Sequence, residues 1–272
     1  MLLASRITNN KVLLSIIILA FYFLGQFGSK LLYPFYGHLL VDFDRTTRVV
    51  LWQLLYYGLV PLVATVLLVG WRQVPSALGL DKGFLRGLGM AALITLPMFI
   101  GYGWMSDFTV GIDPYNLIFG SISAPFFEEF FFRAFLFGLL YRLAGWSVLP
   151  ATVLDAFVFG IIHVSQGDDL VSSLSVFGVT AAGAAGFSLL YKEWDWNLWF
   201  VVFLHAFMNF AWMLFAVADN AAGGLWANVF RLMSIAIAVV WTIRHVRNKK
   251  ALAQVQGEEV AQSDTARSMV SG

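Results

Sequence analysis

Two adjacent glutamates and an arginine lie within a run of phenylalanines, at Glu128, Glu129 and Arg133. An ionised side chain at the centre of a membrane helix is costly, at about 2.5–3.5 kcal/mol for Asp, Lys or Arg on insertion scales. The surrounding residues 118–140 are strongly apolar, so three such charges would be costly to bury and are expected there only if they have a function. The stretch therefore indicates a functional site, and a purely structural ion-pair network is the competing interpretation.

Spacing along a helix separates the roles of these charged residues. Glu129 and Arg133 are four residues apart, so they share one helix face and can pair. Glu128 is rotated by about 100° from Glu129 and lacks that partner. We therefore predict that Glu128 acts as a base, while the pair of Glu129 and Arg133 fixes the helix and the position of Glu128.

Further polar residues fall inside other apolar runs. His163 follows Phe159 by four residues, and Asn209 follows His205 by the same spacing. A carboxylate, two imidazoles and an amide in a low-dielectric site can activate a water molecule. Glu128 would take a proton from a water held between it and His163. His205 and Asn209 could donate hydrogen bonds to the oxyanion of a peptide carbonyl as it forms.

A metal-dependent mechanism is the alternative use of the same residues. Glu128, His163 and His205 could bind a divalent metal that acidifies the attacking water. Glutamate and histidine ligands suit zinc, while the absence of cysteine excludes a thiolate site. The sequence leaves both mechanisms open.

Two more residues bear on the helix that carries the glutamates and on its neighbour. Pro125 precedes Glu128 by three residues and should bend the helix and free a backbone carbonyl beside the carboxylates. Asp155 lies in the next apolar run, where it could face the cavity or pair with a loop.

The composition predicts the class of fold that must position these side chains. Of the 272 residues, 60% are hydrophobic and 12% are charged, about half the charge fraction of a soluble domain. Apolar runs of about 20 residues indicate an all-α polytopic membrane protein. The net charge of +1 gives no sign of nucleic-acid binding. The expected partners are membrane lipids and a membrane-associated peptide or protein substrate.

The apolar runs predict one transmembrane helical domain over residues 1–243 and a basic, disordered cytoplasmic tail over residues 244–272. Lysine and arginine in alternate connections place both termini in the cytoplasm. We expect an integral protein of a bacterial or archaeal cytoplasmic membrane. The eight expected spans are residues 12–32, 49–69, 87–105, 115–143, 148–164, 170–191, 198–217 and 225–243.

Three motifs in this order resemble those of the CPBP intramembrane proteases. This family joins the type II CAAX prenyl endopeptidases to bacteriocin-processing and bacteriocin-immunity proteins. The resemblance covers about residues 78–215. The motifs are Glu-Glu-x-x-x-Arg at Glu128, Glu129 and Arg133, Phe-x-x-x-His at Phe159 and His163, and His-x-x-x-Asn at His205 and Asn209.

The resemblance implies that the paired glutamates and both histidines form the catalytic set and that the asparagine assists. The family has been described as metal-dependent, whereas its architecture favours a glutamate-activated water without metal. Two other functions stay open. One is a non-catalytic bacteriocin-immunity or membrane scaffold protein. The other is a proton-coupled transporter, because buried carboxylates and histidines also relay protons.

Overall fold

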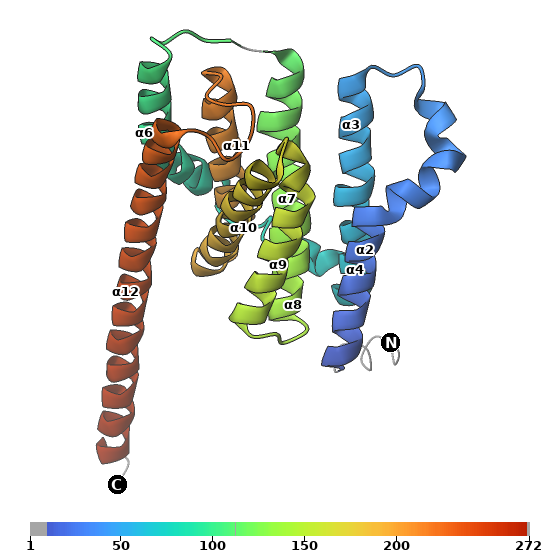
Figure 1. The fold of residues 1–272 in the computed structure, drawn as a ribbon. Helices are drawn as coiled ribbons and strands as arrows, with labels where there is room; N and C mark the ends of the chain where they lie inside the picture. The colour runs from blue at the N-terminus through green and yellow to red at the C-terminus, as the bar shows by residue number, and fades with distance from the viewer. Residues whose placement is uncertain (1–9, 112, 271–272) are drawn as a thin grey trace. The chain divides into compact units, whose positions relative to one another are not determined.

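A computed structural model of the chain describes residues 10–111 and 113–270, with side-chain environments through residue 256. Within these ranges the chain forms helices and no strand, which confirms the all-α class (Figure 1). Six helical stretches are long and apolar enough to cross a membrane. They are Lys11–Leu40, Arg45–Val69, Phe84–Met105, Val148–Gln166, Leu170–Glu193 and Leu225–Gln256. The protein is therefore a polytopic integral membrane protein.

Two of the eight expected spans are not among these six stretches. One is α11 (Leu198–Leu214), which is apolar but has 17 residues. The other is the charged stretch, which is helical throughout residues 114–142. The total of eight spans stays a prediction.

The charged stretch alternates between α-helical and wider π-helical turns. Its segments are π-helix η4 (Asn116–Ser123), α7 (Ala124–Glu128), π-helix η5 (Glu129–Phe137) and α8 (Gly138–Arg142). π-turns are rare and occur frequently at functional sites. The two glutamates lie at the junction between α7 and η5, where the helical register changes.

Several of the remaining helices of the first 234 residues contact this stretch, among them α2, α9, α10 and α11. Their bounds are α2 (Lys11–Tyr36), η1 (Gly37–Leu40), α3 (Arg45–Gln53), π-helix η2 (Leu54–Leu59), α4 (Val60–Val69), η3 (Trp71–Gln73), α5 (Val74–Ala77), α6 (Phe84–Met105), α9 (Val148–His163), η6 (Val164–Gln166) and α10 (Leu170–Glu193).

Glycines allow two close helix pairs to form. A Cβ atom at Gly87 of α6 would lie 2.7 Å from the backbone nitrogen of Phe200 in α11. A Cβ atom at Gly160 of α9 would lie 2.9 Å from the ring of Phe177 in α10. Small residues permit such close approach in lipid, where helix association depends on van der Waals packing. These contacts pair α6 with α11 and α9 with α10, and α9 and α11 in turn contact η5, which carries Glu129.

The π-helix η5 forms the centre of the core, and all nine of its residues are buried. On one face, Phe131 stacks on Tyr22 of α2 and on Tyr57 of η2, with ring centroids 5.3 Å and 4.5 Å apart. The hydroxyl of Tyr57 donates to the side chain of Gln26 over 2.9 Å. This aromatic face attaches the glutamate-bearing helix to the first two spans.

The C-terminal part of the chain contains one long helix. The chain divides into the compact units Met1–Ser234 and Ile235–Gly272. The helix α12 (Leu225–Val270) includes most of residues 244–272, and the expected transmembrane domain over residues 1–243 with a disordered tail stays a prediction. Its tail portion is rich in Ala, Gln, Lys and Arg, which are strong helix formers.

Candidate active site

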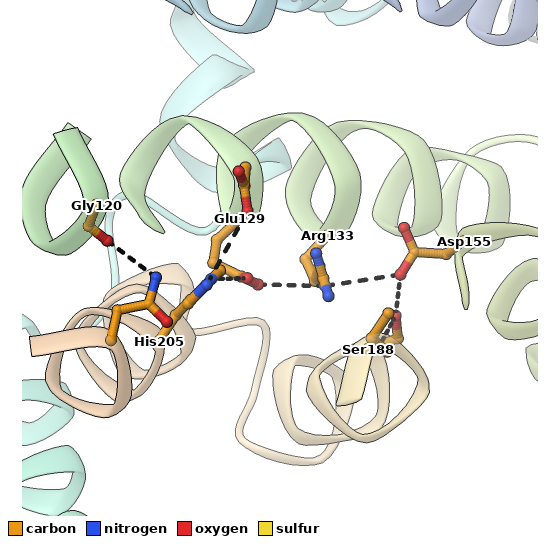
Figure 2. Close-up of polar contacts among 9 residues, drawn as sticks. Gly120, Glu129, Arg133, Asp155, Ser188 and His205 are labelled. Carbon is orange, nitrogen blue, oxygen red and sulfur yellow. Dashed lines mark hydrogen bonds and ion pairs between the residues drawn. The ribbon is translucent and has the colours of Figure 1, made fainter. Parts of the chain in front are cut away.

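Glu129 lies at the centre of a row of polar side chains from four helices (Figure 2). The row consists of His205, Glu129, Arg133, Asp155 and Ser188. Its Oε1 atom accepts a hydrogen bond from Nδ1 of His205 over 2.8 Å. Its Oε2 atom lies 3.3 Å from Nε of Arg133. The pair that the four-residue spacing predicted is therefore present, and the same carboxylate also holds a histidine from α11.

His205 turns its second ring nitrogen toward Glu128. Since the Glu129 carboxylate is the acceptor, the ring carries a proton on Nδ1. The Nε2 atom is 4.0 Å from Oε2 of Glu128, which is too long for a hydrogen bond. Both side chains are 16% exposed, whereas the Glu129 side chain is fully buried. The two groups thus face each other at a distance that a small polar group beside them could bridge with two hydrogen bonds.

The amide of Asn209 is oriented by a backbone carbonyl. Its Nδ2 atom donates to the carbonyl oxygen of Gly120 over 2.9 Å. In this π-helical register the N–H of Ala124 bonds to the carbonyl of Phe119. The next nitrogen belongs to Pro125, which has no N–H for the carbonyl of Gly120. The free carbonyl expected from the proline is therefore the one that holds Asn209.

One face of α11 carries all of these contacts. His205, Asn209 and Met213 follow one another at four-residue spacing. A Cβ atom at Gly120 would lie 2.6 Å from Sδ of Met213, so a larger residue there would require the methionine side chain to move. Asn209 reaches the backbone of Gly120 beside this contact.

His163 bonds to the backbone of its own helix. Its Nδ1 atom donates to the carbonyl of Phe159 over 2.7 Å, which leaves Nε2 without a proton in the neutral ring. Within residues 10–111 and 113–270, no hydrogen bond or ion pair joins His163 to Glu128 or His205. The structure thus brings Glu128 and His205 together and does not add His163 to them.

Phe159 connects the second motif to the first. Its ring centroid lies 4.2 Å from the guanidinium carbon of Arg133, which is a cation–π contact. Its ring also packs on that of His163, with centroids 4.4 Å apart. The phenylalanine predicted as a structural support therefore contacts a charged residue of the first motif and the histidine of its own.

Sequence reasoning missed the far end of the row. Asp155 of α9 lies with its Oδ2 atom 3.6 Å from Nε of Arg133. The same oxygen accepts a hydrogen bond of 2.6 Å from Oγ of Ser188 in α10. Asp155 neither pairs with a loop nor faces an open cavity. The sequence did indicate that a carboxylate inside a span needs a polar or cationic partner. Nothing in the sequence marked Ser188 as that partner.

A metal centre finds no support in the side-chain arrangement. Among the residues that the structure describes, no three His, Cys, Asp or Glu side chains gather closely enough to hold a metal ion. The predicted set of Glu128, His163 and His205 is therefore not assembled. As these residues stand they do not fit a three-ligand zinc site, and we derive no step through a metal.

Comparison with known proteins identifies a family for the segment that contains all three motifs. Residues 110–211 match the family model of Rce1-like type II CAAX prenyl endopeptidases. No curated protein and no solved structure matches the chain. The family match confirms the predicted resemblance to the CPBP proteases and supports a CAAX-type intramembrane protease in general.

Proposed function

We propose that this protein is an intramembrane endopeptidase that hydrolyses a peptide bond in a membrane-associated or lipidated protein or peptide. The observation that carries the proposal is the pair of half-buried groups, Glu128 and His205, that face each other at 4.0 Å. A fully buried carboxylate, Glu129, holds the imidazole in place. The family match to residues 110–211 supports the same class of reaction.

In the first step, Glu128 removes a proton from a water molecule. The water oxygen attacks the carbonyl carbon of the peptide bond, and the carbonyl oxygen takes up the negative charge. The separation of 4.0 Å between Glu128 and His205 suits a water that hydrogen-bonds to both. A general base of this kind contributes about 10²–10⁴-fold to the rate.

Asn209 and His205 stabilise the oxyanion. The Asn209 amide donates one N–H to the carbonyl of Gly120 and has a second N–H that can donate to the oxyanion. His205 donates from Nε2 when it enters the reaction as an imidazolium that already carries both ring protons, because Nδ1–H is bonded to Glu129 and the proton from water goes to Glu128. The neighbouring carboxylate offsets the charge of that imidazolium, as the aspartate does in serine protease triads.

In the second step, the protonated Glu128 donates its proton to the nitrogen of the leaving amine. The C–N bond breaks, the carbonyl reforms, and Glu128 returns to its ionised state. One water molecule is consumed, and the products are a carboxylic acid and an amine. Arg133 does not take part directly, since it lies on the buried side of Glu129.

His163 and the metal-dependent mechanism stay as proposals to be tested. His163 could contribute its free Nε2 after substrate binding, because catalytic hydrogen bonds often tighten only in the substrate complex. A divalent metal would require a similar rearrangement of Glu128 and His163. Its contribution is measurable by removing metal from the purified protein.

The test is cleavage of a peptide library by the purified protein in lipid nanodiscs, with and without a chelator. Half of the library carries a C-terminal isoprenoid, since the matching family is described as prenyl endopeptidases. The control is Glu128→Gln, which keeps the shape of the side chain and removes the base. We expect cleavage by the wild type, with and without chelator, and none by the variant.

Equal cleavage by both proteins would contradict the proposal, and loss of cleavage with chelator would establish the metal mechanism. A cellular phenotype that survives Glu128→Gln, without cleavage, would favour an immunity or scaffold protein. Proton flux into proteoliposomes that requires Glu128, without cleavage, would favour a transporter.

A further inference from the structure

Asp155 is a buried charge that the proposed reaction does not use. It lies on α9 and is fully buried, as are Glu129 and Ser188. Figure 2 shows it beyond Arg133, on the opposite side from Glu129. A buried carboxylate is costly unless it is paired and hydrogen-bonded, so its place in the row requires an explanation.

The guanidinium of Arg133 is shared between two carboxylates. Its Nε atom lies 3.3 Å from Glu129 and 3.6 Å from Asp155. Both distances exceed those of ordinary charge-assisted hydrogen bonds, at about 2.7–2.9 Å. An arginine with one carboxylate partner commonly binds both of its oxygens in a bidentate fork. Here Nε of Arg133 lies between the two carboxylates and forms a full hydrogen bond with neither of them.

Sharing leaves one oxygen of Glu129 for the histidine. Arg133 faces Oε2, and Oε1 accepts the proton of His205. If Arg133 also bonded to Oε1, it would compete with the imidazole for that oxygen and pull the carboxylate away from the ring. The position of the guanidinium therefore affects how firmly Glu129 holds His205.

Aromatic rings restrict how Arg133 can respond. Its guanidinium carbon lies 4.2 Å from the ring centroid of Phe159 and 5.7 Å from that of Phe187. The residue is 1% exposed, so it cannot turn to water. Within this enclosure, movement between the two carboxylates is the available displacement.

Ser188 fixes the competing carboxylate. Its hydroxyl lies 2.6 Å from Oδ2 of Asp155 and 3.1 Å from the carbonyl of Ala184, one turn earlier in α10. The same oxygen of Asp155 faces Arg133. The helix α10 thus determines how far the carboxylate of α9 reaches toward the guanidinium.

We propose that Asp155 is a positioning residue that, by sharing Arg133, keeps one oxygen of Glu129 free. That oxygen then holds the ring of His205 in line with the reacting groups. The catalytic consequence rests on the proposed peptidase function, whereas the orientation of His205 does not. An asparagine at position 155 would still accept a hydrogen bond from Ser188. It would have no negative charge to attract Arg133, whose guanidinium would then move closer to Glu129.

The first measurement is the NMR spectrum of protein labelled with ¹⁵N-histidine. The chain has 4 histidines, so the Nδ1–H signal of His205 is assigned by its absence in His205→Gln. A proton shared with a carboxylate gives a strongly downfield signal. We expect this signal in the wild type and its loss or a large upfield shift in Asp155→Asn.

Thr152→Val is the matched control for that substitution. Thr152 lies on α9 close to one turn before Asp155, is 8% exposed, and its Oγ1 atom has no hydrogen-bond partner among the described residues. The nearly isosteric valine disturbs the same helix without touching the row. We expect the His205 signal to stay unchanged in this variant.

The second measurement is kinetic, with a peptide cleaved by the wild type. Misplacement of a reacting group by a distant substitution can lower the rate by about 100-fold. We expect kcat of Asp155→Asn to fall by about that factor, with KM unchanged. A merely structural aspartate would lower thermal stability and leave both kcat and the His205 signal intact, which would overturn the proposal.

A folding failure of Asp155→Asn leaves the proposal testable through Ser188→Ala, which keeps the carboxylate and removes its anchor. A weakened His205 signal and a smaller loss of kcat would support the proposal, and an unchanged signal would refute it. If the signal responds as expected but no variant or wild type cleaves peptide, the positioning role stands and the proposed function fails.

Discussion

The two faces of the π-helix η5 are both buried but are built in opposite ways. One face presents Phe131 to the tyrosines of α2 and η2, in a stack with centroid distances of 5.3 Å and 4.5 Å. The other face presents Glu129 and Arg133 to α9 and α11. The same nine-residue segment therefore meets one set of neighbours through rings and the other through charges.

The aromatic face needs no chemical explanation. Stacked aromatic pairs contribute about 0.5–1.5 kcal/mol each beyond the burial of their area. Gly25 of α2 lies directly against the ring of Phe131, where a Cβ atom would come within 2.6 Å. This face serves packing, and many apolar side chains of similar volume could replace its rings.

The polar face has no such justification in stability. Buried ion pairs are often neutral or unfavourable compared with apolar residues of the same volume. Its carboxylates and guanidinium are nevertheless held by partners from α9, α10 and α11. We infer that the polar face is kept for the histidine that it positions opposite Glu128, and not for stability.

Substitution of Arg133 should give the largest effect on stability. Arg133→Met fills the same space but leaves Glu129 and Asp155 buried without a counter-charge. Removing one partner of a buried pair costs about 3–5 kcal/mol. Unfolding by denaturant in detergent, followed by tryptophan fluorescence, measures the loss. Arg133→Lys is the control that keeps the charge, and a stability of Arg133→Met equal to that of the wild type would contradict the account.

Substitution of Asn209 should affect the rate more than the fold. Removing one oxyanion donor typically lowers kcat by about 10²–10³-fold, while the lost helix–helix hydrogen bond contributes about 0.6 kcal/mol. We expect Asn209→Ala to show this division in steady-state cleavage and unfolding assays. Met213→Leu, on the same face of α11, should change neither strongly. Comparable losses of kcat in the two variants would refute a specific role for the amide.

Substitution on the aromatic face should show the reverse division. Phe131→Leu keeps an apolar side chain but removes the stacking on Tyr22 and Tyr57, at a cost of about 1–2 kcal/mol. We expect a lower unfolding temperature and an unchanged kcat per folded molecule. A selective loss of kcat would show that the two faces are not separable.

Replacement of Pro125 should give the smallest effect. Pro125→Ala supplies an N–H that competes with Asn209 for the carbonyl of Gly120. A net hydrogen bond contributes about 0.5–1.5 kcal/mol, which corresponds to a loss in kcat of about two- to tenfold. Because the effect acts through Asn209, it should vanish in an Asn209→Ala background. Additive losses in that double-mutant cycle would contradict the mechanism.

The sequence predicted what depends on position along a single helix. Four-residue spacing was sufficient for the pair of Glu129 and Arg133, and the missing N–H of Pro125 was sufficient to expect a free carbonyl. The apolar runs were sufficient for the helical membrane class. Each of these inferences uses only local geometry and the hydrogen-bonding capacity of the residue itself.

The sequence could not predict contacts that depend on how helices rotate against one another. His205 bonds to Glu129, although its spacing along the chain gave no preference between the two glutamates. Ser188 reaches Asp155 across the packed pair of α9 and α10, whose contact no local spacing specifies. The interhelical register that gathers these residues is a property of the packed core.

The most direct measurement compares Glu128→Gln with Glu129→Gln in peptide cleavage and thermal unfolding. We assign the first glutamate to chemistry and the second to both positioning and the buried charge network. We predict that Glu128→Gln keeps the unfolding temperature of the wild type and loses cleavage by about 10²–10⁴-fold, whereas Glu129→Gln loses both. Cleavage that persists in Glu128→Gln would contradict the central claim.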